Sequence, residues 1–371
     1  MPLFFLLKNF ANIKLLWYIV PMEKQKLAVV AMSGGVDSSV TALLLQQQGY
    51  KVIGLTAKMQ DTQAASNVVQ NAKRVAEDLG IELIVYNTVD LFNEKVINYF
   101  VDAYKNGKTP NPCIVCNQFV KWGKLFDYAT EILEADVFAT GHYADIRFEN
   151  GFYKLYPAKD EHKDQLYFLY RLGQKQLSKT IFPLYHYEKS QVKQIATDYN
   201  LPPKDSKESQ DICFIQKPVT TKSFLINKFG TKKGDFIDVL TGKKWGEHQG
   251  CYQYTIGQRK GIGIAAPYPL YVIDIDANKN IVYLGREEDN YKKSLKVVNL
   301  NWCYPLQNTE FDAWVKIRYN MSHKKAHVSV CGEIAVIEFY EPVNSVTNGQ
   351  SCVIYDLEDK HLIGGGFIER N

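Results

Sequence analysis

Two stretches of the chain combine residue types that could handle phosphate and sulfur. The first is the run SGGVDS from Ser33 to Ser38. Its glycines, Gly34 and Gly35, can adopt positive φ and bring backbone amides close to an anion, while its serines add hydroxyl donors at the start of an expected helix. The lysine of a Walker loop and a dinucleotide fingerprint are both missing. The run therefore predicts another kind of phosphate loop, and an ordinary glycine-rich turn is the alternative.

The second stretch is a Cys-x-x-Cys pair, Cys113 and Cys116, in a proline-stiffened loop from Thr109 to Asn117. Zinc needs four ligands, and no second pair follows in the sequence. The flanking residues do not fit a thioredoxin-like redox motif. A nucleophilic thiolate beside a substrate is the preferred interpretation, because Lys121 lies one helical turn further on and favours the charged form. Two ordinary buried cysteines are the alternative.

A third cysteine, Cys213, stands after a polar loop and before an apolar, strand-like segment. A lone cysteine in such a place is normally structural. Pairing with Cys116 would give it a chemical role, because persulfide chemistry needs one thiol that carries sulfur and another that resolves it. The chain holds seven cysteines without framework spacing, which indicates reactive thiols in a reducing cytoplasm rather than a disulfide scaffold.

Strand and helix signals alternate from residue 26 to about residue 144, which predicts a doubly wound parallel sheet. Ligands of such sheets bind beyond the carboxyl ends of the strands, where the Ser33 loop lies. At the same edge, Gly141 would allow close approach of a nucleotide, and His142 would either touch substrate or be an ordinary turn histidine. The expected strands are Leu27 to Met32, Lys51 to Thr56, Glu82 to Asn87 and Val137 to Thr140.

Beyond this sheet we expect a helical, tyrosine-rich region, and near residue 217 lysines accumulate before short strands and turns take over. The turn from Tyr254 to Gly261 is basic and has aromatic neighbours. It is suited to contacts with the phosphates and sugars of a nucleic acid, and a basic turn exposed to solvent is the alternative. Five alternating segments then predict a small β-barrel. They are Phe311 to Tyr319, Ala326 to Val330, Ile334 to Phe339, Ser351 to Tyr355 and Leu362 to Ile368.

The predicted fold class is therefore α/β: a doubly wound phosphate-loop domain at 22–216, a small central β-rich domain at 217–291 and a C-terminal β-barrel at 292–371. Residues 1–21 are apolar, but polar residues break them into pieces too short to span a bilayer, and no small-residue cleavage site follows. We expect them to be a non-native or disordered extension. The net charge of +4 is too small to attract polyanions everywhere, so a nucleic-acid partner would need local basic patches.

The Ser33 to Ser38 run resembles the loop of the N-type ATP pyrophosphatases (PP-loop enzymes), which split ATP into AMP and pyrophosphate while adenylating a substrate. From residue 26 to residue 367 the chain resembles the tRNA-specific 2-thiouridylase family, MnmA, which replaces the C2 oxygen of the wobble uridine with sulfur. The matching segments are Ser33 to Ser38, Thr109 to Asn117, Ala139 to Tyr143, Lys163 to Gln165, Ser209 to Phe214, Tyr254 to Gly263, Lys316 to Tyr319, Val346 to Gln350 and Gly364 to Gly366.

The resemblance implies roles for particular residues. It makes Cys116 the nucleophile and Cys213 the persulfide carrier, and the central domain a tRNA-binding domain. ATP, with Mg, would bind Ala31, Met32, Ser33, Gly34, Gly35, Val36, Asp37, Ser38, Ala57 and Gly141, Asp37 being a magnesium or positioning residue. The target base would lie near Asn111, Pro112 and Cys113. The tRNA would contact His142, Lys163, Asp164, Gln165, Arg318, Tyr319 and Gln350.

The chemistry implied by the resemblance is adenylation of the uridine C2 oxygen, followed by attack of sulfur from a Cys213 persulfide. A persulfide donor protein would load Cys213, and Cys116 would release the product, leaving a Cys116 to Cys213 disulfide for a reductant. Many members carry Asp at the position of Cys113, so this chain has an additional thiol here. Cys113, Cys116 and Cys213 could instead hold a [4Fe-4S] cluster together. The segment Lys58 to Thr62 also lacks the usual Asn-Trp of the family.

Two other functions compete with thiolation. One is a non-catalytic tRNA-binding protein on this scaffold, against which the intact Ser33 loop and the cysteine pair argue. The other is an adenylating synthetase that uses ammonia, against which the β-rich tail and the lack of a glutaminase segment argue. ATP cleavage stimulated by tRNA would separate all three.

Overall fold

The computed structural model describes residues 25–202 and 212–370. The expected extension, residues 1–21, and residues 209–211 of the segment before Cys213 lie outside this range. Within the described residues, five parallel strands form a sheet in the order β3-β2-β1-β4-β7. They are β1 (Leu27–Ala31), β2 (Lys51–Lys58), β3 (Glu82–Asn87), β4 (Val137–Ala139) and β7 (Thr180–Ile181).

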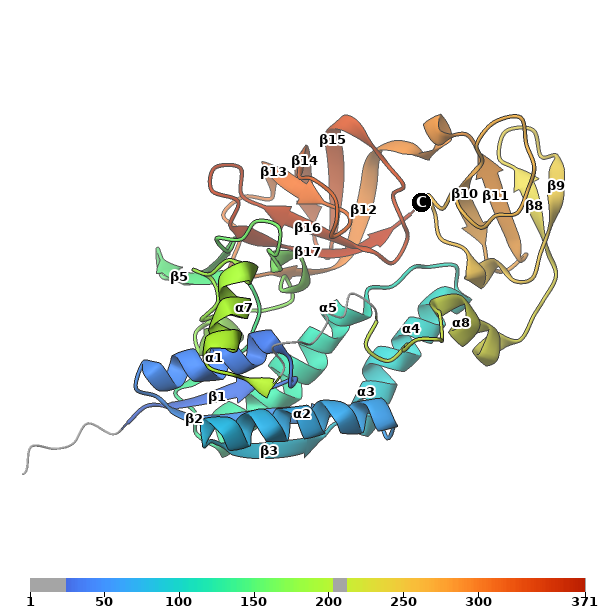
Figure 1. The fold of residues 1–371 in the computed structure, drawn as a ribbon. Helices are drawn as coiled ribbons and strands as arrows, with labels where there is room; N and C mark the ends of the chain where they lie inside the picture. Colours follow the sequence, from blue (N-terminus) through green and yellow to red (C-terminus); the bar gives the residue numbers. More distant parts are fainter. Residues whose placement is uncertain (1–24, 203–211, 371) are drawn as a thin grey trace, which may run out of the picture.

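Helices cover both faces of this sheet, which confirms the doubly wound prediction (Figure 1). Successive side chains of a strand point to opposite faces. On β1, Ala28 and Val30 therefore pack in one core cluster and Val29 in another. Helices α1 (Val36–Gln47) and α2 (Gln63–Leu79) complete the first cluster, and the helices after β3 complete the second. The chain reverses its direction across the sheet at β1, which is where such folds bind ligands.

The helical region between β3 and β4 carries the cysteine pair. It includes a nine-residue stretch of π-helix, η2, directly after the pair, and π-helical turns are often found at functional sites. The helical segments are α3 (Val89–Phe92), η1 (Asn93–Ile97), α4 (Asn98–Lys105), α5 (Pro112–Cys116), η2 (Asn117–Leu125) and η3 (Tyr128–Ile132).

The region that we expected to be helical after residue 144 begins instead with a β-hairpin. Strands β5 (Asp145–Glu149) and β6 (Phe152–Tyr156) are antiparallel, and Leu155 of β6 pairs with a strand of the C-terminal barrel. The turn between them is Asn150-Gly151, with φ of 53° and 83°. Asn-Gly between two runs of aromatic residues is a hairpin signal, and the prediction overlooked it. Short helices follow: η4 (Leu166–Phe168), α6 (Gln174–Leu177) and α7 (Lys189–Asp198).

The remaining chain is mainly β-structure, as predicted. After α8 (Thr221–Phe229), a four-stranded sheet in the order β10-β11-β8-β9 forms the central domain. The C-terminal strands form a closed barrel of six strands, β12-β15-β14-β13-β16-β17, closed by the β12–β17 pairing. The central strands are β8 (Gly234–Asp238), β9 (Lys244–His248), β10 (Tyr271–Asp276) and β11 (Ile281–Gly285). The barrel strands are β12 (Tyr291–Trp302), β13 (Glu310–Lys316), β14 (Lys324–Cys331), β15 (Ile334–Asn344), β16 (Ser351–Tyr355) and β17 (Leu362–Glu369).

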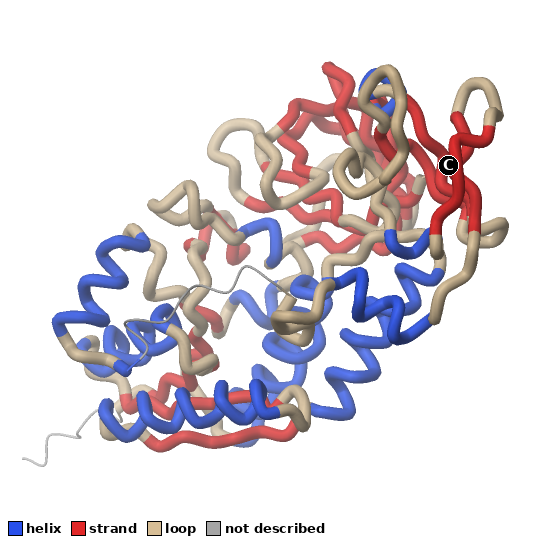
Figure 2. Tube along the Cα trace, turned by 45° about the vertical axis from the view of Figure 1, so that its right-hand side comes forward, coloured by secondary structure: helices blue, strands red, loops and turns tan. Residues whose placement is uncertain are grey.

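The prediction of five barrel strands missed a sixth strand, β12. Its first four residues are exposed and include consecutive lysines, so its sequence shows no alternation of buried and exposed positions there. Figure 2 shows the helices gathered in one half of the molecule and most of the strands in the other. None of the helices in the described residues is both long and apolar enough to cross a membrane.

Candidate functional site

The Ser33 loop joins β1 to α1 and is held by its own serines. The backbone N–H of Ser33 donates to Oγ of Ser38 at 3.2 Å, and Oγ of Ser38 donates to the carbonyl of Gly35 at 3.1 Å. Gly34 has φ of +71°, whereas Gly35 is extended with φ of −94° and forms the N-cap of α1. No side chain caps the first turn among the described residues, so backbone amides at the start of α1 are available to an anion.

Asp37 lies in this first turn and is paired with a buried lysine. Nζ of Lys189, at the start of α7, lies 2.6 Å from both carboxylate oxygens of Asp37. The hydroxyl of Tyr143 donates to Oδ1 of the same carboxylate at 3.0 Å. Lys189 is only 8% exposed and Tyr143 3%. The positive charge of Lys189 offsets the charge of this carboxylate, and the two donors fix its orientation.

Gly141 is in contact with the same turn. A Cβ at Gly141 would lie 2.8 Å from the carbonyl carbon of Asp37 and 2.9 Å from the amide nitrogen of Ser38. The close approach that this glycine permits in the structure is therefore to the loop backbone. Ala57, near the end of β2, packs against the same core cluster as Cys116. Ala31 ends β1, and Met32 is buried directly behind the loop.

The cysteine pair lies on the short helix α5. Oδ1 of Asn111 caps this helix by accepting the N–H of Cys113 at 3.2 Å, and Pro112 occupies its first position. Cys116 is buried, whereas Cys113 is exposed. The amide of Asn117 donates to the carbonyl of Phe168 at 3.0 Å, which ties the end of α5 to the segment that follows the predicted tRNA-binding residues.

Cys213 lies beside this pair, although the strand expected after it is absent. It sits in a turn in which the N–H of Ile215 donates to the carbonyl of Ile212 at 2.9 Å. Phe214 and Ile215 pack in the same core cluster as Cys116. Cys116 and Cys213 are both free thiols in this structure.

Desolvation controls the protonation of the thiols. It raises the pKa of Cys116 to about 12 and that of Cys213 to about 11, and it also raises the pKa of Cys113. Lys121 opposes this shift at all three, while the pKa of Cys116 is raised further by the charges of the other two thiols. The three cysteines and Lys121 therefore share one electrostatic environment.

His142 lies in the core of the same domain. Its ring is 5.2 Å from that of Trp122, and its Nδ1 is 2.7 Å from Oγ1 of Thr140. Desolvation and, to a lesser extent, Lys121 hold the pKa of His142 well below its ordinary value, so the imidazole is neutral at pH 7.

The other predicted tRNA-binding residues surround the segment from Lys163 to Tyr170. The ring of Tyr319 lies 4.6 Å from that of Phe168, with Lys316 Nζ over it at 5.6 Å. Arg318, next to Tyr319, donates through Nη2 to the carbonyl and side chain of Asn344.

Asp164 belongs to the same group and is close to Lys316. Desolvation raises the pKa of Asp164 to about 6, and the charge of Lys316 partly opposes the shift. Its Oδ1 is buried and has no hydrogen-bond partner among the described residues. Within the predicted segment, Gln165 has a different role: its side chain accepts the N–H of Tyr143 at 3.0 Å.

Gln350 reaches the cysteine loop from the barrel. Its Nε2 donates to the carbonyl of Thr109 at 2.8 Å, and the N–H of Thr109 donates to the carbonyl of Asn348 at 2.8 Å. The hydroxyl of Thr109 lies 3.3 Å from that of Thr255 in the central domain. Segments of all three domains therefore meet at the start of the cysteine loop.

Sequence reasoning assigned no role to Thr109, Tyr143 or Lys189. Lys189 begins α7 after a capping glutamate, and a lysine in the first turn of a helix gives no sign of a buried partner 152 positions away. Tyr143 and Thr109 stand in segments that matched the family, but such a match does not say which atoms they contact. The structure shows these contacts. In the basic turn Tyr254 to Gly261, Arg259 and Lys260 are exposed.

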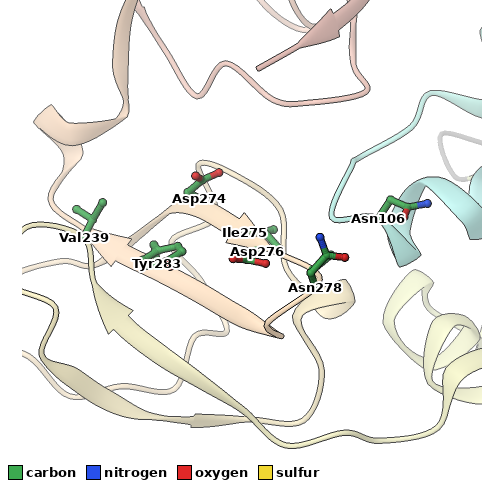
Figure 3. A pocket seen from close by; sticks show the side chains of 8 residues that line it. Asn106, Val239, Asp274, Ile275, Asp276, Asn278 and Tyr283 are labelled. Atoms are coloured by element: carbon green, nitrogen blue, oxygen red, sulfur yellow. The ribbon is translucent and has the colours of Figure 1, made fainter. Parts of the chain in front are cut away.

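Two other features lie away from the thiols. A groove of about 630 Å³ is lined by polar side chains of β10 and by Asn106 at the end of α4 (Figure 3). Its Asp274 pairs with Arg370 at 3.2 Å, and none of the predicted site residues lines it. On the barrel, His361 lies 2.6 Å from Asp359 and 2.7 Å from the hydroxyl of Tyr304, so both of its ring nitrogens are bonded within the protein.

Three domain families match the chain in succession. They are the tRNA methyl transferase HUP domain at residues 26–217, the tRNA methyl transferase PRC-barrel domain at 222–286 and the aminomethyltransferase beta-barrel domain at 292–368.

Curated relatives match over nearly the whole chain. The tRNA-specific 2-thiouridylase MnmA of Halothermothrix orenii is 43% identical over 357 residues, 92% of this chain and 99% of that protein. The protein of the same name from Clostridium acetobutylicum is 42% identical over 359 residues, 93% of this chain and 99% of that protein. Among solved structures, the U34-tRNA thiolase NcsA of Methanococcus maripaludis is 19% identical with a TM-score of 0.35, covering 51% of this chain and 60% of that one.

Proposed function

The chain belongs to the family of tRNA-specific 2-thiouridylases, and from this premise we propose that it catalyses ATP-dependent 2-thiolation of the wobble uridine of tRNA. The observation that carries the proposal is the placement of two thiols, Cys116 and Cys213, beside a core cluster that reaches the nucleotide edge of the sheet at Ala57. A binding protein would have no use for this arrangement, and neither would a synthetase that uses ammonia.

ATP binds at the Ser33 loop in this proposal. Its phosphates accept hydrogen bonds from the uncapped amides of α1 and from the loop serines, while Gly141 allows the loop its close packing. Asp37 acts as a positioning residue, because Lys189 already occupies both of its oxygens. A magnesium ion would bind chiefly to the phosphates and supply charge neutralisation there.

Adenylation converts the C2 oxygen of the uridine into a good leaving group. The terminal sulfur of a Cys213 persulfide then attacks C2, loses its proton, and AMP departs with the electron pair of the C2–O bond. The thiolate of Cys116 next attacks Sγ of Cys213, so that the S–S bond breaks toward the new thiocarbonyl and a Cys116–Cys213 disulfide forms. A thiol reductant returns the disulfide to two thiols, and a persulfide donor protein reloads Cys213.

The target uridine enters from the anticodon loop, where unstacking a base costs little. Asn111 and Pro112, the start of α5, lie one turn from Cys116 and would contact the base. Lys163, Arg318, Tyr319 and Gln350 would contact the tRNA backbone, together with the central domain. Asp164 would lie beside this contact surface, and the buried His142 would support it from the core.

Three thiols are also the donor set of a [4Fe-4S] cluster with one open iron. Cys113, Cys116 and Cys213 share one electrostatic environment, so these are the residues that would hold such a group. A cluster would supply an iron that holds sulfide. The persulfide route remains our main proposal, and the iron and acid-labile sulfide content of protein purified without oxygen distinguishes the two.

We also propose that the domains divide at residues 216 and 291, and that the protein works in the cytoplasm. The second point rests on the thiol chemistry, which requires a reducing compartment.

The function is tested by following ATP cleavage and thiolation together. With a wobble-uridine tRNA, a persulfide donor and ATP, we expect AMP and 2-thiouridine in equal amounts, and AMP release that depends on the tRNA. A protein that binds tRNA without cleaving ATP would be a binder, and cleavage driven by ammonia and a small acid would indicate a synthetase.

A further inference from the structure

Two chains of hydrogen bonds run from Asp37 of the phosphate loop to the segment that we expect to bind tRNA. Asp37 is the common end of both, because Tyr143 and Lys189 each donate to its carboxylate. A carboxylate in the first turn of a helix that binds phosphate would repel the incoming anion unless a cation neutralised it. Whether a cation offsets the charge of this carboxylate therefore directly affects ATP binding.

The first chain runs through Tyr143 to Gln165. The backbone N–H of Tyr143 donates to Oε1 of Gln165 at 3.0 Å, and the N–H of Gln165 donates to the carbonyl of Tyr143 at 3.0 Å. Tyr143 is thus clamped to Gln165 by its backbone and to Asp37 by its hydroxyl. A shift of the Gln165 backbone must move Tyr143, because the core around this tyrosine is closely packed.

The second chain runs through Lys189 to Asp160. The backbone N–H of Lys189 donates to Oδ2 of Asp160 at 3.0 Å. The other oxygen of Asp160 accepts the N–H of His162 at 3.1 Å, and its carbonyl accepts the N–H of Lys163 at 3.0 Å. The turn that presents Lys163 to tRNA is therefore built on the residue that also holds the start of α7.

We propose that Tyr143 and Lys189 are positioning residues that couple the binding of tRNA at Lys163 to Gln165 to the binding of ATP at the Ser33 loop. When tRNA orders the segment from Lys163 to Gln165, both hydrogen-bond chains hold Asp37 against Lys189. The backbone amides of the Ser33 loop are then positioned to bind the phosphates of ATP. The inference rests on the proposed function, since it takes ATP and tRNA as the two ligands. It adds a physical link between their sites.

The test is to measure the coupling between the two ligands. The probe for the loop is the α,β-methylene analogue of ATP, which cannot be cleaved at the bond that this reaction breaks. Its dissociation constant is measured with and without saturating wobble-uridine tRNA, and the tRNA constant with and without the analogue. Linkage requires the same ratio from both measurements, and we expect a ratio of about 5 or more in the unmodified protein.

Each hydrogen-bond chain is cut by a single substitution. Tyr143→Phe removes the hydroxyl but keeps the ring, and leaves Asp37 bonded to Lys189. Asp160→Ala removes the acceptor of the second chain. We expect each variant to lower the ratio and the double variant to bring it near 1, while both ligands still bind when each is measured by itself.

Tyr187→Phe is the matched control. Tyr187 packs against the same apolar cluster as Tyr143, and its hydroxyl makes no hydrogen bond with any residue in the described ranges. The control should keep the full ratio. A double variant that keeps the full ratio would overturn the inference, as would an unmodified protein that binds both ligands without coupling. If the unmodified protein binds neither ligand, the proposed function itself fails.

Discussion

Single residues decide the chemistry through protonation. Cys116 is buried in an apolar cluster, and desolvation raises its pKa to about 12. Its thiolate is therefore a minor species at neutral pH, and Lys121 is the cation that favours it. None of the residues in the described ranges forms a hydrogen bond or ion pair with Lys121, so its charge remains available to an anionic sulfur.

Replacing Lys121 should slow reactions of the Cys116 thiolate. For Lys121→Met we expect alkylation of Cys116 by iodoacetamide at pH 8 to fall about tenfold, the effect of one pKa unit. The rate should rise with pH in both proteins, because the thiolate fraction grows up to the raised pKa. Lys121→Arg should restore most of the rate.

Lys124→Met serves as the control, because Lys124 is exposed on the same helix. Alkylation is followed by mass spectrometry of the labelled peptide. Equal rates for Cys116 in the Lys121→Met variant and the unmodified protein would show that Lys121 does not favour the thiolate.

Asp164 should make tRNA binding depend on pH. Its pKa is raised to about 6, so it is ionised at pH 7.5 and neutral at pH 5. Below pH 6 the carboxylate no longer offsets Lys316, and the phosphates of tRNA meet more positive charge. We expect tRNA affinity to rise about two- to fivefold between pH 7.5 and pH 5, measured by filter binding at constant salt.

Asp164→Asn should remove most of this change and bind at pH 7.5 as the unmodified protein binds at pH 5. An unchanged pH profile in the variant would assign the effect to other groups.

At the scale of elements, the phosphate loop depends on close packing between segments that are distant in sequence. The loop and α1 were predicted from the glycines and the helical pattern after them. The contact between Gly141 and Asp37 was not predictable, because it depends on how β4 and β1 are aligned in the sheet. The same applies to Lys189, whose partner is fixed by the packing of α7 on α1.

A side chain at Gly141 should therefore displace the loop. The Cβ of Gly141→Ala would lie 2.8 Å from backbone and side-chain atoms of Asp37, and neither α1 nor β4 can move freely in a packed core. We expect at least a tenfold weaker affinity for the ATP analogue, measured by calorimetry, with tRNA binding unchanged.

Gly173→Ala is the control, because the nearest atom to its added Cβ is the side chain of Gln176 at 3.6 Å. Normal nucleotide affinity in Gly141→Ala would mean that the loop tolerates displacement and that this contact has no role in ATP binding.

At the scale of the whole molecule, loops of the three domains meet at Thr109. The sequence allowed the domain order and the fold class to be predicted, because each domain has its own pattern of alternation. It could not show that Gln350, expected to contact tRNA, also holds the carbonyl of Thr109 before the cysteine loop. The hairpin β5–β6 was missed although its Asn150-Gly151 turn is a local signal, and only its pairing with the barrel sheet depends on contacts distant in sequence.

Breaking this link should affect catalysis more than binding. Gln350→Glu removes the donor to Thr109 and places a second acceptor against its carbonyl. We expect the thiolation rate constant under single-turnover conditions to fall about tenfold or more, and tRNA affinity to fall less than threefold. Gln194→Glu, an exposed change on α7, controls for the added charge. A loss confined to affinity would make Gln350 a tRNA contact only.

The central claim is that sulfur passes from Cys213 to tRNA in a reaction that needs ATP and Cys116. The most direct measurement loads the protein with a radioactive persulfide, removes the donor, and adds wobble-uridine tRNA with or without ATP. We predict that label moves to 2-thiouridine only with ATP, that Cys213→Ser takes up no label, and that Cys116→Ser retains its label on protein or on a tRNA adduct while still binding tRNA. Transfer of label in the Cys213→Ser variant, or ATP-independent transfer, would contradict the account.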